Sequence, residues 1–105
     1  MKNSDINRIF REGAHTAGNF IFLKFTQNNL RTNRFAFAVG IKISKKAVAR
    51  NKIKRELREI IKENILKLKT GFDFLIIAKP QIIKKKYQEI KKEIEGLFKK
   101  IKIYQ

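Results

Sequence analysis

The sequence predicts an α/β (α+β) sandwich, in which helices pack on one small mixed sheet. Strand-like alternation of large and small residues over 34–44 and a nearly continuous apolar run over 72–78 lie on either side of a long amphipathic segment, residues 47–69. A strand–helix–strand unit of this kind suggests two parallel strands. With 105 residues and a hydrophobic fraction of 43%, the chain can form one core. We expect a single domain over residues 1–105, with no room for a separate catalytic module.

The N-terminal segment is predicted to be a short helix. Ile6, Ile9 and Phe10 share one face at helical spacing. Ser4 precedes this face as a candidate N-cap, and Gly13 follows it as a C-terminal stop.

Two strands are predicted before the long helix. Residues 19–26 alternate between two faces, one of which carries Phe20 and Phe22 together with Lys24. In residues 34–44 the large side chains fall on one face, and small residues occupy most of the other, which suggests close packing or a shallow groove there.

The remaining elements follow from apolar spacing. The segment 47–69 carries a helical core stripe formed by Ile53, Leu57, Ile60, Ile61, Asn64 and Leu68. Thr70 and Gly71 end it, and the apolar run over 72–78 is typical of a strand covered on both sides. A last helix is predicted to open at Pro80, with a core stripe formed by Ile83, Tyr87, Ile90, Ile94, Leu97 and Ile101.

Composition limits the classes of function. The chain has 26 Lys and Arg against 9 Asp and Glu, a net charge of +17, so a polyanion is the expected partner and no small-molecule substrate is indicated. The lack of cysteine excludes disulfides and thiolate metal sites and fits a reducing compartment. No apolar run approaches the length of a membrane span, and no signal peptide is visible. We expect a cytoplasmic protein without membrane contact.

The positive charge is concentrated around the start of the long helix. Between residues 40 and 62 there are nine Lys and Arg and two Glu. One helix face, away from the core stripe, carries Asn51, Arg55, Arg58 and Lys62, and it is bordered by Lys54 and entered at Arg50. Arginine binds phosphate oxygens with two parallel hydrogen bonds, and Lys45 and Lys46 lie beside the helix N-terminus, where free N–H groups favour anions. This face is predicted to bind the phosphates of a polyanion, although a solvated charged face is the ordinary alternative.

The other charged or polar residues are not expected to form a specific binding site. The C-terminal lysines, Lys84–Lys86 and Lys99, Lys100 and Lys102, are expected to give diffuse attraction from a solvated face. Lys52 and Glu56 can pair at i, i+4, so the acids of the long helix are better explained as solubilising pairs. His15, the only histidine, has no second ligand or nucleophile near it and is expected to lie in a loop.

Residues 44–59 resemble the signature of the protein component of bacterial ribonuclease P. That family carries a Ser-Lys-Lys element, then Ala-Val, then an Arg-Asn-(Arg/Lys)-x-Lys-Arg-x-x-Arg helix, which here falls on Arg50, Asn51, Lys52, Lys54, Arg55 and Arg58. The order of the other elements also matches over nearly the whole chain. Three residues fewer than usual separate Lys46 from Arg50, which implies a tighter turn into the helix.

The resemblance implies an α-β-β-β-α-β-α order in which the long helix joins two strands by a left-handed crossover. It also implies a subunit whose partners are the ribonuclease P RNA and the single-stranded 5′ leader of precursor tRNA. The RNA, not this chain, would hold Mg²⁺ and cleave the leader, so no catalytic or metal-binding residue is expected on the protein. The RNA-subunit contacts would be Arg50, Asn51, Lys54, Arg55 and Arg58, with Lys45, Lys46 and Lys62 beside them. The leader-cleft candidates are Phe10, Phe20, Phe22 and Val39.

Two other functions remain open from the sequence. A ribosomal protein or similar structural rRNA-binding protein would share the size and the charge, and only the Arg-Asn helix and the Phe cleft argue against it. A protein-only nuclease would need Glu56, Glu59 and Glu63 to bind Mg²⁺, but they lie on one helix face with Lys52 among them and have no partner cluster.

Overall fold

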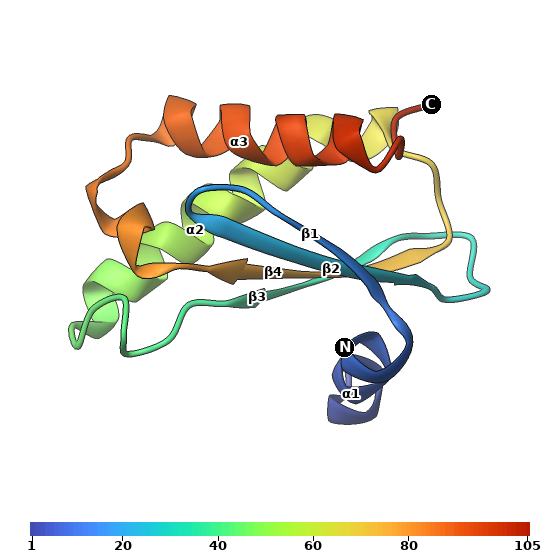
Figure 1. The fold of residues 1–105 in the computed structure, drawn as a ribbon, viewed down its shortest axis with the longest axis horizontal. Coiled ribbons are helices and arrows are strands. Elements are labelled where there is room, and N and C mark those ends of the chain that lie inside the picture. Colours follow the sequence, from blue (N-terminus) through green and yellow to red (C-terminus); the bar gives the residue numbers. More distant parts are fainter.

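The computed structural model describes residues 1–105 as three α-helices and a four-stranded sheet, shown in Figure 1. The elements follow the predicted α-β-β-β-α-β-α order. In chain order they are α1 (Asn3–Glu12), β1 (Ala14–Ala17), β2 (Ile21–Gln27), β3 (Arg34–Ala38), α2 (Ala47–Asn64), β4 (Phe72–Ala78) and α3 (Tyr87–Lys100), with short 3-10 helices η1 (Ile65–Lys67) and η2 (Pro80–Lys84). None of the helices has the length and apolar character needed to cross a membrane.

The sheet is mixed, as expected, with strand order β1-β2-β4-β3. β1 pairs with β2 and β2 pairs with β4 in antiparallel fashion, whereas β3 and β4 are parallel and are joined through α2. The predicted strand–helix–strand unit with two parallel strands is therefore confirmed. β4 is the strand with a neighbour on each side along nearly its whole length, which explains its nearly continuous apolar sequence.

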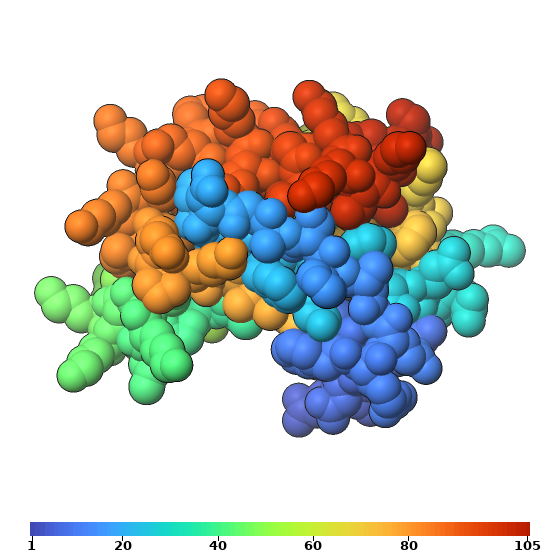
Figure 2. Space-filling view, viewed as in Figure 1, coloured from blue at the N-terminus to red at the C-terminus, as the bar shows by residue number.

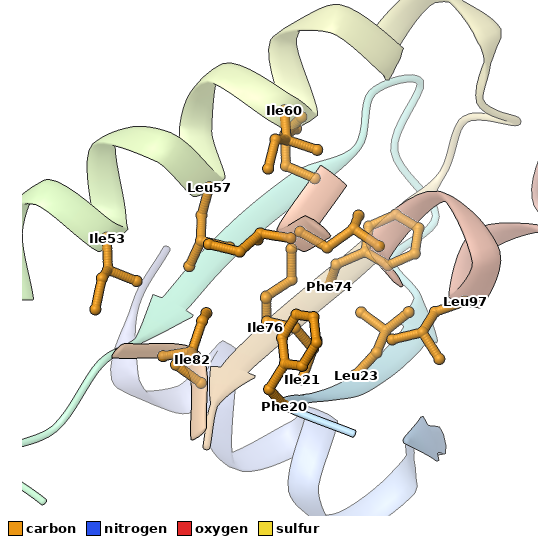
Figure 3. Close-up of a cluster of buried hydrophobic side chains, with 14 of the residues drawn as sticks. Phe20, Ile21, Leu23, Ile53, Leu57, Ile60, Phe74, Ile76, Ile82 and Leu97 are labelled. Carbon is orange, nitrogen blue, oxygen red and sulfur yellow. The ribbon is translucent and has the colours of Figure 1, made fainter. Parts of the chain in front are cut away.

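Helices α2 and α3 cover one face of the sheet, and α1 lies on the opposite side (Figure 1). The main core lies under α2 and α3, where Phe74 and Ile76 of β4 meet Leu57 and Ile60 of α2 (Figure 3). All six residues of the predicted stripe in the long helix are buried. We call the other side of the sheet, over which α1 lies, the α1-side face.

Three predicted boundaries differ from the structure. The strand expected over 34–44 ends at Ala38, because the chain turns at Gly40 to bury Ile43, whose N–H bonds to the Gly40 carbonyl. The long helix is α-helical only to Asn64 and then tightens into η1. The last helix is split: η2 and an extended Lys85–Lys86 link precede α3, so Ile82 is buried and Ile83 is 45% exposed instead of lying in the core stripe.

β1 was not identified from its own residues. It is four residues long, and Thr16 is the only one of them that is buried, so the segment carries no alternating apolar pattern. Because it pairs with β2, the prediction that His15 lies in a loop is wrong: His15 is a strand residue opposite Lys24.

α1 is anchored by a buried acidic residue of the sheet. Asp73 in β4 is 1% exposed and accepts two hydrogen bonds from the Arg34 guanidinium, at 2.8 and 2.7 Å, and one from the Asn28 amide at 2.9 Å. Arg34 also lies 3.3 Å from a carboxylate oxygen of Asp5 in α1. The network therefore joins α1, β3, β4 and the loop after β2.

The ends of α1 differ in detail from the prediction. The helix begins at Asn3, and the Asp5 carboxylate, not Ser4, accepts the N–H of the residue before the helix, Lys2, at 2.9 Å. Gly13 does end it, although its φ of −76° is ordinary. Glycine is needed there because a Cβ would collide with the carbonyl oxygens of Ile9 and Phe25.

The hydrogen bonds to Asp73 determine its ionisation. Burial alone raises the pKa of this carboxyl, but the hydrogen bonds from Arg34 and Asn28 outweigh that cost and hold the pKa below its ordinary value. In the folded protein the carboxylate is therefore ionised at neutral pH, and its charge stabilises the fold.

Asp73→Asn is expected to lower the free energy of unfolding at pH 7 by about 2 kcal/mol, because it removes the charge from a buried, hydrogen-bonded acceptor. Since the folded pKa is lowered, the stabilisation is present above the ordinary carboxyl pKa of about 3.9 and is lost as the pH falls through the lowered value. Urea unfolding of parent and variant should give a gap that narrows from pH 7 to pH 3. Glu59→Gln, at an exposed carboxylate, is the control and should change stability by less than about 0.5 kcal/mol. A gap that is independent of pH would contradict this role of Asp73.

Candidate nucleic-acid interface

The predicted stripe on the long helix is a solvent-facing row of α2. Since the core residues of α2 point toward the sheet, the residues on the other side of the helix are exposed: Asn51, Arg55, Arg58 and Lys62. Lys54 and Arg50 at its border are half-buried. The structure thus brings the predicted RNA-subunit residues together on one surface. We call this surface, with Lys45 and Lys46 included, the cationic surface.

The cations of this surface have no acidic partner. The structure contains five ion pairs, and none of them includes a residue of the cationic surface. Arg58 is positioned instead by an aromatic ring, with its guanidinium 5.7 Å from the ring centroid of Phe37. An array of unpaired guanidinium and ammonium groups is suited to phosphate oxygens, because no internal salt bridge has to be broken on binding.

The start of α2 adds backbone donors to this surface. Lys46 directly precedes the helix, which begins at Ala47. The turn is held by Ser44, whose hydroxyl accepts the Lys46 N–H at 3.2 Å and whose carbonyl accepts the Arg50 guanidinium at 2.9 Å. The first turn of α2 contains no acidic residue and no side-chain cap, so its free N–H groups and positive dipole end face solvent. Figure 2 shows this end of the molecule, in green, projecting beyond the sheet.

The glutamates of α2 form no ion pair with the cationic surface. Glu63 lies 2.6 Å from the Lys91 ammonium and accepts a hydrogen bond from the Tyr87 hydroxyl, so it ties α2 to α3. The hydrogen bonds from Lys91 and Tyr87 lower the pKa of Glu63, and burial together with Glu63 raises the pKa of Tyr87 to about 12. The predicted Lys52–Glu56 pair does not form in the structure.

A second candidate surface lies on the α1-side face. Phe10 of α1 is 53% exposed, and the Lys24 ammonium of β2 lies 5.1 Å from its ring centroid. The same ammonium lies 5.9 Å from the ring centroid of Phe22. Phe22 in turn stacks on His15 of β1, with ring centroids 5.4 Å apart and an angle of 19° between the planes. We call Phe10, Lys24, Phe22 and His15 the aromatic row.

The structure does not bring Phe20 and Val39 into this row. They are 6% and 7% exposed and belong to the main core under α2 and α3, as Figure 3 shows for Phe20. Phe20 precedes β2, and its backbone N–H donates to the Glu93 carboxylate of α3 at 3.0 Å, which directs the residue toward the helices. Of the four leader-cleft candidates, Phe10 is exposed and Phe22 is half-buried on the α1-side face, whereas Phe20 and Val39 are core residues. The part of each in leader binding stays a prediction.

Sequence reasoning missed Lys24, His15 and Arg34. The alternation of residues 19–26 already places Lys24 on the face of Phe22, so this signal was present in the sequence. The positions of His15 and Arg34 depend on pairing between distant strands, β1 with β2 and β3 with β4.

Comparisons with known proteins indicate one family for this chain. The family model described as Ribonuclease P matches residues 1–102. The chain is 37% identical to the ribonuclease P protein component of Fusobacterium nucleatum, over 97% of this chain and 95% of that protein. It is also 37% identical to the one from Pelotomaculum thermopropionicum, over 97% and 90%. The structure resembles the ribonuclease P protein of Staphylococcus aureus (TM-score 0.91, 27% identity, 100% and 95% covered) and that of Thermotoga maritima (TM-score 0.84, 27% identity, 91% and 90% covered).

Proposed function

This chain belongs to the ribonuclease P protein family and is a protein component of that ribonucleoprotein endoribonuclease, and we propose that its one domain carries two RNA-binding surfaces. The cationic surface binds the RNA subunit, and the aromatic row binds the single-stranded 5′ leader of precursor tRNA. The protein thus promotes removal of the leader in the cytoplasm. The observation that carries this proposal is the separation of a helix face with unpaired cations from the aromatic row, in which Phe10 and His15 are exposed and Phe22 is half-buried.

The cationic surface fits a structured RNA. Arg55 and Arg58 are one helical turn apart and exposed, so two guanidinium groups can reach neighbouring phosphates of one RNA segment. The N-terminus of α2 offers a further anion site beside Lys45 and Lys46. A structural rRNA-binding protein would share these features, but membership of the ribonuclease P family favours the RNA subunit of that enzyme.

The aromatic row fits a single strand. Exposed rings bind unpaired bases by stacking, which is worth about 1–3 kcal/mol per base and tolerates different sequences, as a subunit acting on many tRNA precursors requires. Lys24 lies between the rings of Phe10 and Phe22, where its ammonium can neutralise the phosphate between two stacked bases. This placement supports Phe10 and Phe22 as leader contacts, with Lys24 added to them.

We place the Mg²⁺ ions on the RNA subunit. The acids of this chain that are fixed in position already have partners: Asp73 binds Arg34, Glu63 binds Lys91, and the Glu93 carboxylate accepts the N–H groups of the segment before β2. They do not converge on a common point, so they do not fit a metal site. The protein's contribution is to bind and orient.

Reconstitution tests the function as a whole. The purified chain, added to a bacterial ribonuclease P RNA at low Mg²⁺, is expected to stimulate 5′ cleavage of precursor tRNA, because its cations replace part of the charge screening that Mg²⁺ otherwise supplies. The measurement is the rate of leader release with and without protein. No stimulation would refute the assignment of this chain as a functional subunit.

Arg55→Ala is expected to weaken binding of the protein to the RNA subunit and to reduce the slope of log affinity against log salt by about one unit, since one phosphate contact is lost. Binding measured over a salt series gives both values. Arg31→Ala is the matched control, because Arg31 is an exposed arginine in the loop after β2, outside the cationic surface. Equal effects of the two substitutions would show that binding follows net charge and not the α2 stripe.

Phe10→Ala is expected to reduce the leader contribution, defined as the affinity of the reconstituted enzyme for precursor tRNA divided by its affinity for mature tRNA. Loss of one stacking contact should cost about 1–3 kcal/mol. The affinity for mature tRNA and the salt dependence of RNA-subunit binding should stay unchanged. Phe10→Tyr, which keeps an aromatic ring, serves as the control and should retain the contribution. A fall in affinity for both tRNAs would contradict a role in leader binding.

A further inference from the structure

One aromatic contact of the structure includes a residue, His15, that is not among the site residues that the family resemblance implies. The imidazole of His15 stacks on Phe22 at 5.4 Å and 19°, although both side chains belong to a sheet and His15 is exposed to solvent. His15 lies on β1, which is an edge strand of the sheet, and its exposure leaves the imidazole accessible to a ligand. Figure 2 shows that residues of β1 and β2 form the surface between α3 and α1.

The register explains why these two rings meet. His15 is directly opposite Lys24, and Ala17 is directly opposite Phe22, so His15 and Phe22 are diagonal neighbours on the α1-side face. Ala17 is small and leaves room for the imidazole to lie against the phenyl ring. The aromatic row therefore continues across two strands, from Phe10 on α1 to the edge of the sheet.

We propose that His15 is a further leader-binding residue, which stacks on an unpaired base and extends the leader surface from α1 and β2 onto β1. This inference rests on the proposed binding of the leader to the α1-side face. The ligand is a nucleotide of the same single strand that contacts Phe10, at the other end of the aromatic row. A planar ring already held parallel to Phe22 offers a base a stacking face at a low cost in side-chain ordering.

The charges around His15 favour RNA over an acidic or apolar protein segment. Lys24 faces His15 from β2, and its ammonium has no acidic partner. The carboxylates on this side are bound by arginine: Glu12 at the end of α1 pairs with Arg8 at 2.8 Å, and Asp5 and Asp73 share Arg34. The Lys24 ammonium, which has no such partner, is therefore the charge within the aromatic row that is available to a phosphate.

The test uses the holoenzyme reconstituted with ribonuclease P RNA, and it compares the leader contribution of parent, His15→Ala and His15→Phe. His15→Ala should reduce that contribution at least about fivefold when the leader is long enough to cover the row, because one stacking contact is lost. His15→Phe keeps a ring and should retain it. His15 is exposed, so both variants should fold as the parent does; Ala14→Ser, at an exposed position of the same strand, is the control.

The outcomes separate this inference from the function on which it rests. A normal leader contribution in His15→Ala, together with a reduced one in Phe10→Ala, would overturn the role of His15 and leave the leader site in place. A normal contribution in both variants would overturn the leader site itself. Loss in His15→Phe as large as in His15→Ala would overturn stacking as the mode of contact. Equal loss of affinity for mature tRNA would assign His15 a structural role instead.

Discussion

The buried Asp73 carboxylate is the interaction on which the arrangement of the molecule depends. It holds Arg34, which in turn binds Asp5, so one charge network fixes α1 against the sheet. The hydrogen bonds from Arg34 and Asn28 offset the free-energy cost of burying the charged carboxylate. Without this anchor α1 would be held by its short apolar face and by the Arg8 guanidinium, which donates to the Gln27 carbonyl of β2 at 2.8 Å, and Phe10 would be less firmly fixed beside Lys24.

Most of the other acidic side chains are also engaged within the chain, which determines the charge left on the surface. Seven of the nine acidic residues accept a hydrogen bond from another part of the chain or lie in an ion pair, and only Glu56 and Glu59 do neither. Acids thus serve largely to join elements, as Glu93 joins α3 to the start of β2 and Glu63 joins α2 to α3. The excess of cations remains on the outside, and the cations of the cationic surface have no acidic partner. The charge of +17 is therefore available to a polyanion in an ordered form.

Sequence patterns predicted those features that depend on local periodicity. The core stripe of the long helix, the parallel strands on either side of it and the exposed position of Arg55 and Arg58 all follow from residue spacing. The features that were missed depend on tertiary contacts. β1 exists because it pairs with β2, Phe20 is buried because Glu93 binds its backbone, and η2 turns because Ile82 has a place in the core. No pattern within a single segment contains that information.

The positions of the two surfaces also determine which kinetic quantity the protein can change. If the aromatic row binds the leader as proposed, and the reacting atoms lie in the RNA subunit, its binding energy would be the same in the ground state and in the transition state of cleavage. Uniform binding of this kind lowers the dissociation constant or KM of precursor tRNA and leaves kcat unchanged. The cationic surface, in contrast, would act through the RNA subunit and so would affect all substrates alike. With both surfaces on one domain, the proposed leader contact would raise the affinity of the RNA active site for precursor tRNA over mature tRNA.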